Sequence, residues 1–181
     1  MVVRPGTNSY NKQDTYDGLA RIPLFHVAIS LIAIASGLIV AYGLLTANRM
    51  RGTTLLLLVT TIATSVTGFF FHRDQVTPAQ IVGVISLVLL ATTCAALYVY
   101  DLRRFWRAIY AAGAVMCLYL NVFVLVVQLF LKIPSLHELA PKGSEPPFAI
   151  TQGIVLVLFV ALGISAVKRF RPAALSAPAG L

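Results

Sequence analysis

The chain has 181 residues, of which 59% are hydrophobic and 11% charged, and its formal net charge is +8. A soluble globular domain carries roughly 25% charged residues, so this composition excludes an ordinary soluble protein. The mean hydropathy of +0.87 predicts a protein embedded in a lipid bilayer. The positive charge needs no nucleic-acid partner, because arginine and lysine beside membrane helices commonly bind anionic headgroups.

Residues 1–21 are polar and lack the apolar core and cleavage site of a removable signal peptide, so we expect the first apolar segment to direct insertion. A spanning helix needs about 20 largely apolar residues. Five segments meet this requirement: 22–46, 53–71, 79–100, 106–131 and 148–167. Short polar separators make consecutive helices antiparallel neighbours. The predicted fold is all-α, an up-and-down bundle of five transmembrane helices in a single domain at 22–170.

The charged residues are unevenly divided between the two faces of this bundle. Eight basic residues lie on the side of the carboxyl terminus, whereas six basic and five of the six acidic residues share the side of the amino terminus. The positive-inside rule therefore predicts an external amino terminus and a cytoplasmic tail at 171–181. Four aromatic residues near the cytoplasmic boundary are typical of an interfacial belt: Tyr98, Tyr100, Trp106 and Tyr110.

All three histidines fall at the outer face of the predicted bundle: His26, His72 and His137. The first two helices share a spacing of four, three and four residues, in His26, Ser30, Ala33 and Gly37 and in Thr61, Ser65, Gly68 and His72. Such spacing marks one helix face. One antiparallel register pairs 26 with 72, 30 with 68, 33 with 65 and 37 with 61. Small residues permit close approach in lipid, so we expect a tight hairpin with two facing imidazoles.

Amide side chains lie at similar depth in the other helices. In hydrocarbon such groups require partners and usually face the bundle interior. Together with two histidines they predict an outward-facing polar pocket that binds a small ligand or cofactor, formed by His26, His72, Gln80, Asn121, Gln128 and Gln152. The alternative is that the amides only link helices. Because the inner halves of the helices are mainly apolar, a channel or carrier for a small solute is a less favoured alternative.

The fourth loop, at 132–147, contains four prolines, which predict an ordered cap or a short interfacial helix. If this cap folds over the bundle, its histidine joins the other two. The resulting metal site would consist of His26, His72 and His137 with Glu138 or Asp74. Imidazoles with a carboxylate suit copper, zinc, iron or nickel. Ordinary interfacial histidines are the alternative, because the spacing itself is not diagnostic.

Three kinds of ligand suit the predicted pocket: haem b, copper or zinc, and a quinone, in a redox or metal-handling role. A close hairpin leaves no room for a porphyrin between the first two helices. No catalytic residues are predicted, since nucleophile-elbow, Walker and dinucleotide motifs are absent, and the sequence favours a non-enzymatic role. Cys94 and Cys117 are expected to be small packing residues. A second hypothesis is a non-catalytic accessory or assembly subunit with membrane partner subunits, or a homo-oligomer.

The stretches TPAQIVGVISLVLL and NVFVLVVQLFLKIPSLHELAPKGSEPPF resemble small polytopic bacterial inner-membrane proteins of no assigned activity. The resemblance covers roughly residues 25–172. It implies a bacterial inner membrane, so that the amino-terminal segment 1–21 and the cap at 132–147 would be periplasmic. It transfers no activity, cofactor or site residue.

Overall fold

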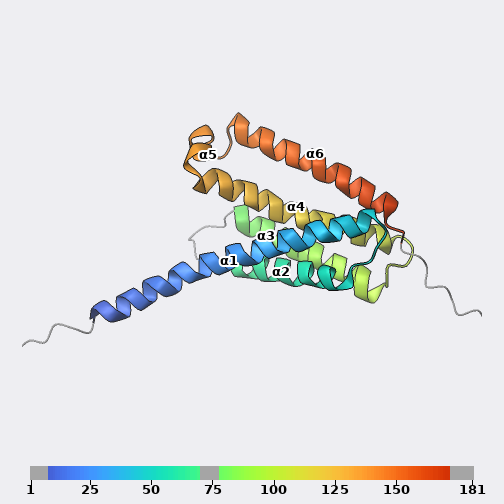
Figure 1. Ribbon diagram of the computed structural model, residues 1–181, viewed down its shortest axis with the longest axis horizontal. Helices are drawn as coiled ribbons and strands as arrows, with labels where there is room; N and C mark the ends of the chain where they lie inside the picture. Colours follow the sequence, from blue (N-terminus) through green and yellow to red (C-terminus); the bar gives the residue numbers. More distant parts are fainter. Residues whose placement is uncertain (1–7, 70–77, 172–181) are drawn as a thin grey trace, which may run out of the picture.

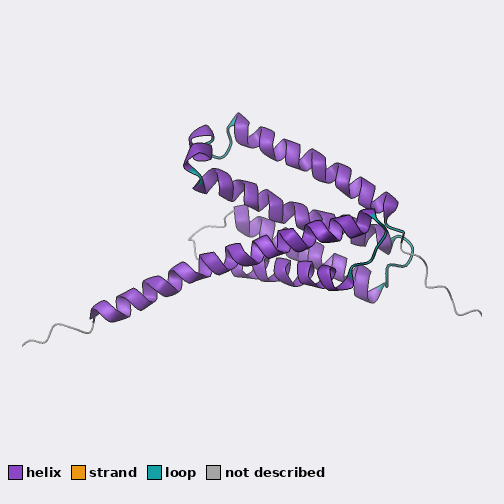
Figure 2. Cartoon of the chain, viewed as in Figure 1, coloured by secondary structure: helices purple, strands orange, loops and turns teal. Residues whose placement is uncertain are grey.

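The computed structural model describes residues 8–69 and 78–171, with side chains from 24 to 68 and from 80 to 171. The described residues are helices joined by short loops, without a β-strand among them (Figure 2). In chain order the elements are α1 (Asn8–Leu45), α2 (Arg51–Phe69), α3 (Pro78–Cys94), the π-helical turn η1 (Ala95–Val99), α4 (Trp106–Lys132), α5 (Pro134–Leu139) and α6 (Pro146–Arg169). The predicted all-α class is confirmed.

Among the described residues, four helical segments are long and apolar enough to cross a membrane: Leu24–Leu45 of α1, Gln80–Val99 of α3 and η1, Trp106–Lys132, and Pro146–Arg169. At about 1.5 Å per residue, each reaches roughly the 30 Å of a bilayer's hydrocarbon core. For α4, α6 and the continuous segment of α3 and η1, the helix bounds agree with the sequence prediction to within two residues. Helix α1 itself begins earlier, at Asn8. The chain is thus a multi-pass membrane protein.

Helix α2 is rich in hydroxyl side chains, with six threonines and a serine among its 19 residues. The hydroxyls of Thr60, Thr64 and Thr67 each donate to the carbonyl oxygen four residues earlier, at 2.6 to 2.8 Å. This bonding satisfies the hydroxyls within the helix. These three hydroxyl groups therefore have hydrogen-bond partners without contact with water.

Helix α4 is the central helix of the bundle. It contacts α1, α3, α5 and α6, while α2 packs against α1 and α3 (Figure 1). It is the most buried of the four candidate spans, and α6 is the least buried. The main core includes Leu44, Leu57, Leu90 and Tyr110, and a smaller one joins α4 to the segment after α5 through Phe130 and Ala140.

Gly37, the last residue of the small-residue stripe of α1, packs against α4. A Cβ atom on Gly37 would lie 2.6 Å from the Cδ1 atom of Leu118, so glycine permits a close approach there. Thr61, the predicted partner of Gly37 on α2, accepts a hydrogen bond from Asn121 of α4. Gly37 and Thr61 both contact α4, so α4 packs onto the hairpin that α1 and α2 form, as expected, with each other.

The two ends of the bundle differ in chemistry. We call the end that carries loops 46–50 and 100–105 the arginine end, and the opposite end, with His26 and α5, the histidine end. The short helix α5 confirms the ordered segment predicted from the prolines, and it packs on α4. After it, the Glu145 carboxylate accepts the backbone N–H groups of Lys142 and Ser144, both at 3.0 Å. These bonds, that from Lys142 above all, lower the pKa of Glu145.

Candidate functional site

At the histidine end, His26 links α1 to α2. Its Nδ1 atom lies 2.8 Å from the hydroxyl oxygen of Thr67, and a Cβ atom on Gly68 would meet its Cε1 atom at 3.8 Å. Gly68 therefore lies beside His26 and not beside Ser30, so the predicted register is wrong by about one turn. Sequence spacing defines a helix face but not the axial offset between two helices. The predicted partner His72 lies outside the described residues, as does Asp74.

Two of the predicted amides form hydrogen bonds between helices. Asn121, 8% exposed, donates through Nδ2 to the Thr61 hydroxyl at 3.3 Å and to its own helix at 2.9 Å. Gln152, 9% exposed, donates through Nε2 to the carbonyl oxygen of Phe123 at 3.1 Å. Its Oε1 atom is buried without a hydrogen-bond partner among the described residues. Both amides link helices, as the alternative interpretation expected.

The remaining predicted ligands within the described part of the chain differ in their exposure. Gln80 and Gln128 are half-buried, and His137 and Glu138 are exposed on α5. Among residues 24–68 and 80–171, no three histidine, cysteine or acidic side chains lie close enough to hold a metal ion. Because His72 is outside these ranges, the predicted metal set stays a prediction.

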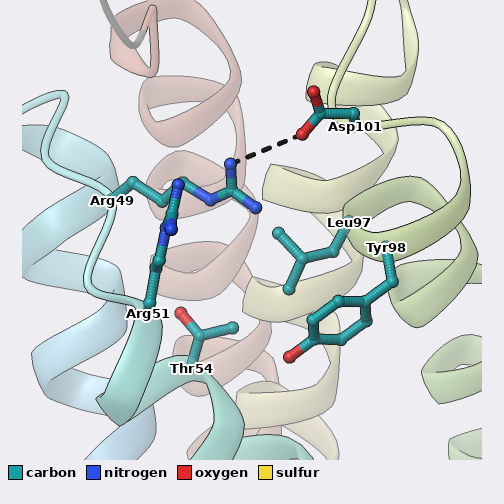
Figure 3. Close-up of a pocket in the computed structure, with 6 residues that line it drawn as sticks. All are labelled: Arg49, Arg51, Thr54, Leu97, Tyr98 and Asp101. Atoms are coloured by element: carbon teal, nitrogen blue, oxygen red, sulfur yellow. Dashed lines mark ion pairs between the residues drawn. The ribbon is translucent and has the colours of Figure 1, made fainter.

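A pocket among the described residues lies instead at the arginine end. It has a volume of about 330 Å³ and is lined by Arg49, Arg51, Thr54, Leu97, Tyr98 and Asp101. Figure 3 shows Arg49 reaching from the loop after α1 toward Asp101, with Arg51 beside it and Tyr98 facing them from η1. We call it the arginine pocket. Its volume is at the lower end of the range for small-ligand sites, about 300–1,000 Å³.

Arg49 is the charged group of this pocket that combines partial burial with a donor that has no partner among the described residues. Its side chain is only 25% exposed, and its Nη1 atom lies 3.7 Å from the Asp101 carboxylate, beyond hydrogen-bond distance. The Nε atom is buried and has no hydrogen-bond partner among the described residues. A guanidinium carries five N–H donors, so Arg49 presents unused donors next to a second cation, Arg51.

Thr54, which lines the arginine pocket, packs against the buried interior of the bundle. The Thr54 hydroxyl and the Tyr110 hydroxyl lie 3.0 Å apart, and the Tyr110 ring contacts that of Phe170 at a centroid distance of 5.5 Å. Tyr110 is only 1% exposed, so its predicted place in the interfacial belt is wrong, whereas Tyr98 and Tyr100 are exposed. The reason is that Tyr110 finds its hydrogen-bond partner inside the bundle.

A second pocket adjoins the first and shares Asp101 with it. Its volume is about 410 Å³, and its other lining residues are Arg103, Arg104, Val99, Tyr100, Phe105 and Trp106. The backbone is left-handed at Asp101, Leu102 and Arg104, with φ of 45°, 56° and 49°. Such residues cost about 1–3 kcal/mol each and gather at functional sites, as do π-helical turns such as η1. We call this the loop pocket.

Sequence reasoning assigned these arginines to general headgroup contact and did not predict a pocket. One signal was available, since Asp101 is the single acid on the side that carries eight basic residues. Comparisons of the chain with protein-family models, curated proteins and solved structures find no match.

Proposed function

We propose that this chain is a five-helix protein of a bacterial inner membrane, with its amino terminus in the periplasm and its carboxyl terminus in the cytoplasm. Helix α2 supports the fifth span, because its first residue, Arg51, lines the arginine pocket and Thr67 contacts His26 at the other end. Its 19 residues extend about 28 Å. The positive-inside rule supports the orientation, and the resemblance stated above supports the bacterial setting.

The function that the geometry supports best is binding of a phosphate-bearing lipid headgroup in the arginine pocket. The observation that carries it is Arg49, a mostly buried guanidinium with one long ionic contact and a buried, unpartnered Nε. Buried polar groups are normally hydrogen-bonded, and a guanidinium binds phosphate through two parallel N–H donors. A phosphate in the pocket would accept hydrogen bonds from the Nη groups of Arg49, which Asp101 at 3.7 Å leaves without one, and would offset the charge of Arg51.

The position of the pocket favours a lipid over a soluble phosphate compound. The pocket lies where spanning helices α1 and α3 end, which is the depth of headgroups in a bilayer. Tyr98, which lines it, is 59% exposed, as expected of an interfacial aromatic residue. Basic pockets between spanning helices on the cytoplasmic side are known to bind anionic headgroups.

The test is a lipid titration of the full chain in a mild non-ionic detergent, followed by native mass spectrometry. We expect phosphatidylglycerol to bind more tightly than zwitterionic phosphatidylcholine. The variant Arg49→Gln should lose about tenfold in affinity, because a charge-assisted hydrogen bond contributes about 1.5–3 kcal/mol. Arg49→Lys keeps the charge but not the fork of donors and should lie between the two.

The matched control is Arg169→Gln, which removes an exposed arginine at the same end that lines neither pocket. It should bind phosphatidylglycerol like the unmodified protein. Equal affinities for Arg49→Gln and Arg169→Gln would show that general charge, and not this pocket, binds the lipid. A parallel titration with inorganic phosphate separates the sources, since equal affinity for phosphate and lipid would indicate a soluble ligand.

A second candidate function is the binding of haem, a transition metal or a quinone at the histidine end. It is supported by the buried Oε1 atom of Gln152, an acceptor that a ligand donor could fill. Protein purified in mild detergent should then show haem absorption, a stoichiometric metal or an extractable quinone. Gln152→Leu should lower that occupancy. A preparation without any of the three would exclude this candidate and leave the arginine pocket unaffected.

A further inference from the structure

The arginine pocket and the loop pocket together form two basic sites on either side of one carboxylate. The first contributes Arg49 and Arg51, the second contributes Arg103 and Arg104, and Asp101 lines both. A single carboxylate offsets one of these four positive charges. A ligand with one phosphate brings a single anionic group to two pairs of arginines.

We propose that the natural ligand is a lipid that carries two phosphate groups, one bound in the arginine pocket and one in the loop pocket. This inference rests on the proposed headgroup-binding function and names the class of lipid. Two phosphodiester groups would bring two negative charges to a site with three unbalanced positive ones. Each pair of guanidinium groups would then face its own phosphate.

The loop that presents the second arginine pair is held in place by its own backbone. The Leu102 N–H donates to the carbonyl oxygen of Ala96, and the Trp106 N–H donates to that of Arg103, both at 3.0 Å. Left-handed backbone at three of the four residues 101–104 turns the loop between these bonds. A loop held in this way loses little further entropy when it binds a ligand.

The loop pocket also offers apolar surface for lipid chains. Phe105 and Val99 are 61% and 72% exposed, and the Trp106 ring stacks on Tyr100 at 3.7 Å between centroids. Both pockets thus combine arginines with exposed aromatic or aliphatic side chains at the end of a spanning segment. A phosphate held by arginines and acyl chains beside such side chains is the arrangement expected of a lipid at an interface.

The test compares diphosphatidylglycerol, which carries two phosphates, with phosphatidylglycerol in the same native mass spectrometry titration. One diphosphatidylglycerol molecule should occupy the site where two phosphatidylglycerol molecules bind. Its affinity should be about 100-fold higher, because the first phosphate raises the effective concentration of the second. Trp106, the single tryptophan of the chain, reports binding in the loop pocket through its fluorescence.

The double variant Arg103→Gln/Arg104→Gln should remove this 100-fold advantage while one phosphatidylglycerol still binds in an Arg49-dependent way, which also shows that the variant is folded. Arg169→Gln should keep the full advantage. Equal affinity of the two lipids in the unmodified protein, or an advantage that survives in the double variant, would refute the two-phosphate ligand. Failure to discriminate either lipid from phosphatidylcholine would instead refute the proposed function itself.

Discussion

Individual polar residues in this bundle serve different purposes according to their partners. Asn121 and the donor group of Gln152 complete hydrogen bonds between helices. Bonds of this kind stabilise membrane bundles modestly, by about 0.6 kcal/mol on average in mutant cycles. Arg49 differs because its buried Nε donor has no partner among the described residues. This unfilled donor supports the proposed binding site, whereas polarity as such does not.

Gly37 shows how one missing side chain positions two helices. In Gly37→Ala the new Cβ atom would approach the fully buried Leu118 side chain at 2.6 Å. Overpacking of this kind costs about 1–3 kcal/mol, so we expect a lower midpoint of thermal unfolding in detergent. The same change at Gly153, where a Cβ atom would meet nothing within 4 Å, should not lower it. A Gly37→Ala protein as stable as Gly153→Ala would contradict the close contact of α1 with α4.

At the scale of elements, α2 meets one criterion for a spanning helix, which is packing along its neighbours, but not another, which is a high mean hydropathy. Its described residues are too polar for it to rank with the four candidate spans, yet it packs along α1 and α3. Threonines that bond back to their own helix reduce the cost of this polarity in lipid. Packing and length, and not mean hydropathy, therefore support α2 as the fifth span.

Cysteine accessibility tests whether α2 crosses the membrane. Single cysteines at Asn48 and at Ser144, both exposed, are introduced after Cys94 and Cys117 are replaced by alanine. If α2 spans, a membrane-impermeant maleimide added to intact cells should label position 144 but not position 48. If α2 does not span, both positions lie on the same side and behave alike. Labelling of both after permeabilisation shows that each thiol is reactive.

At the scale of the whole molecule, exposed apolar side chains and arginine side chains occupy different parts of the bundle. Exposed apolar side chains along α6, such as Ile150 and Val157, suit contact with lipid, and the arginines gather at one end. The predicted partner subunits and homo-oligomer stay predictions. The favoured binding site moves from the histidine end, where the sequence places it, to the arginine end, where the pockets lie.

The sequence by itself determined the class, the bounds of three apolar helical segments to within two residues, and the short helix in the proline-rich loop. These are local properties, because the length of an apolar segment and the position of prolines depend on neighbouring residues in the chain. The orientation and the fifth span follow from the same patterns and stay proposals. For the same reason, sequence patterns place His26 at the start of the first apolar segment without showing which residue of α2 it meets.

Only the tertiary structure decided the axial offset of α2, the contact of Gly37 with Leu118, and the meeting of Arg49 with Asp101. These depend on how far helices slide along one another, and on loops whose backbone bonds and left-handed residues turn side chains distant in sequence toward each other. Lipid solvates any apolar helix face equally well, so apolar periodicity specifies partners weakly inside a membrane. Close packing and hydrogen bonds between helices select the arrangement instead, and they exist only once the helices have assembled.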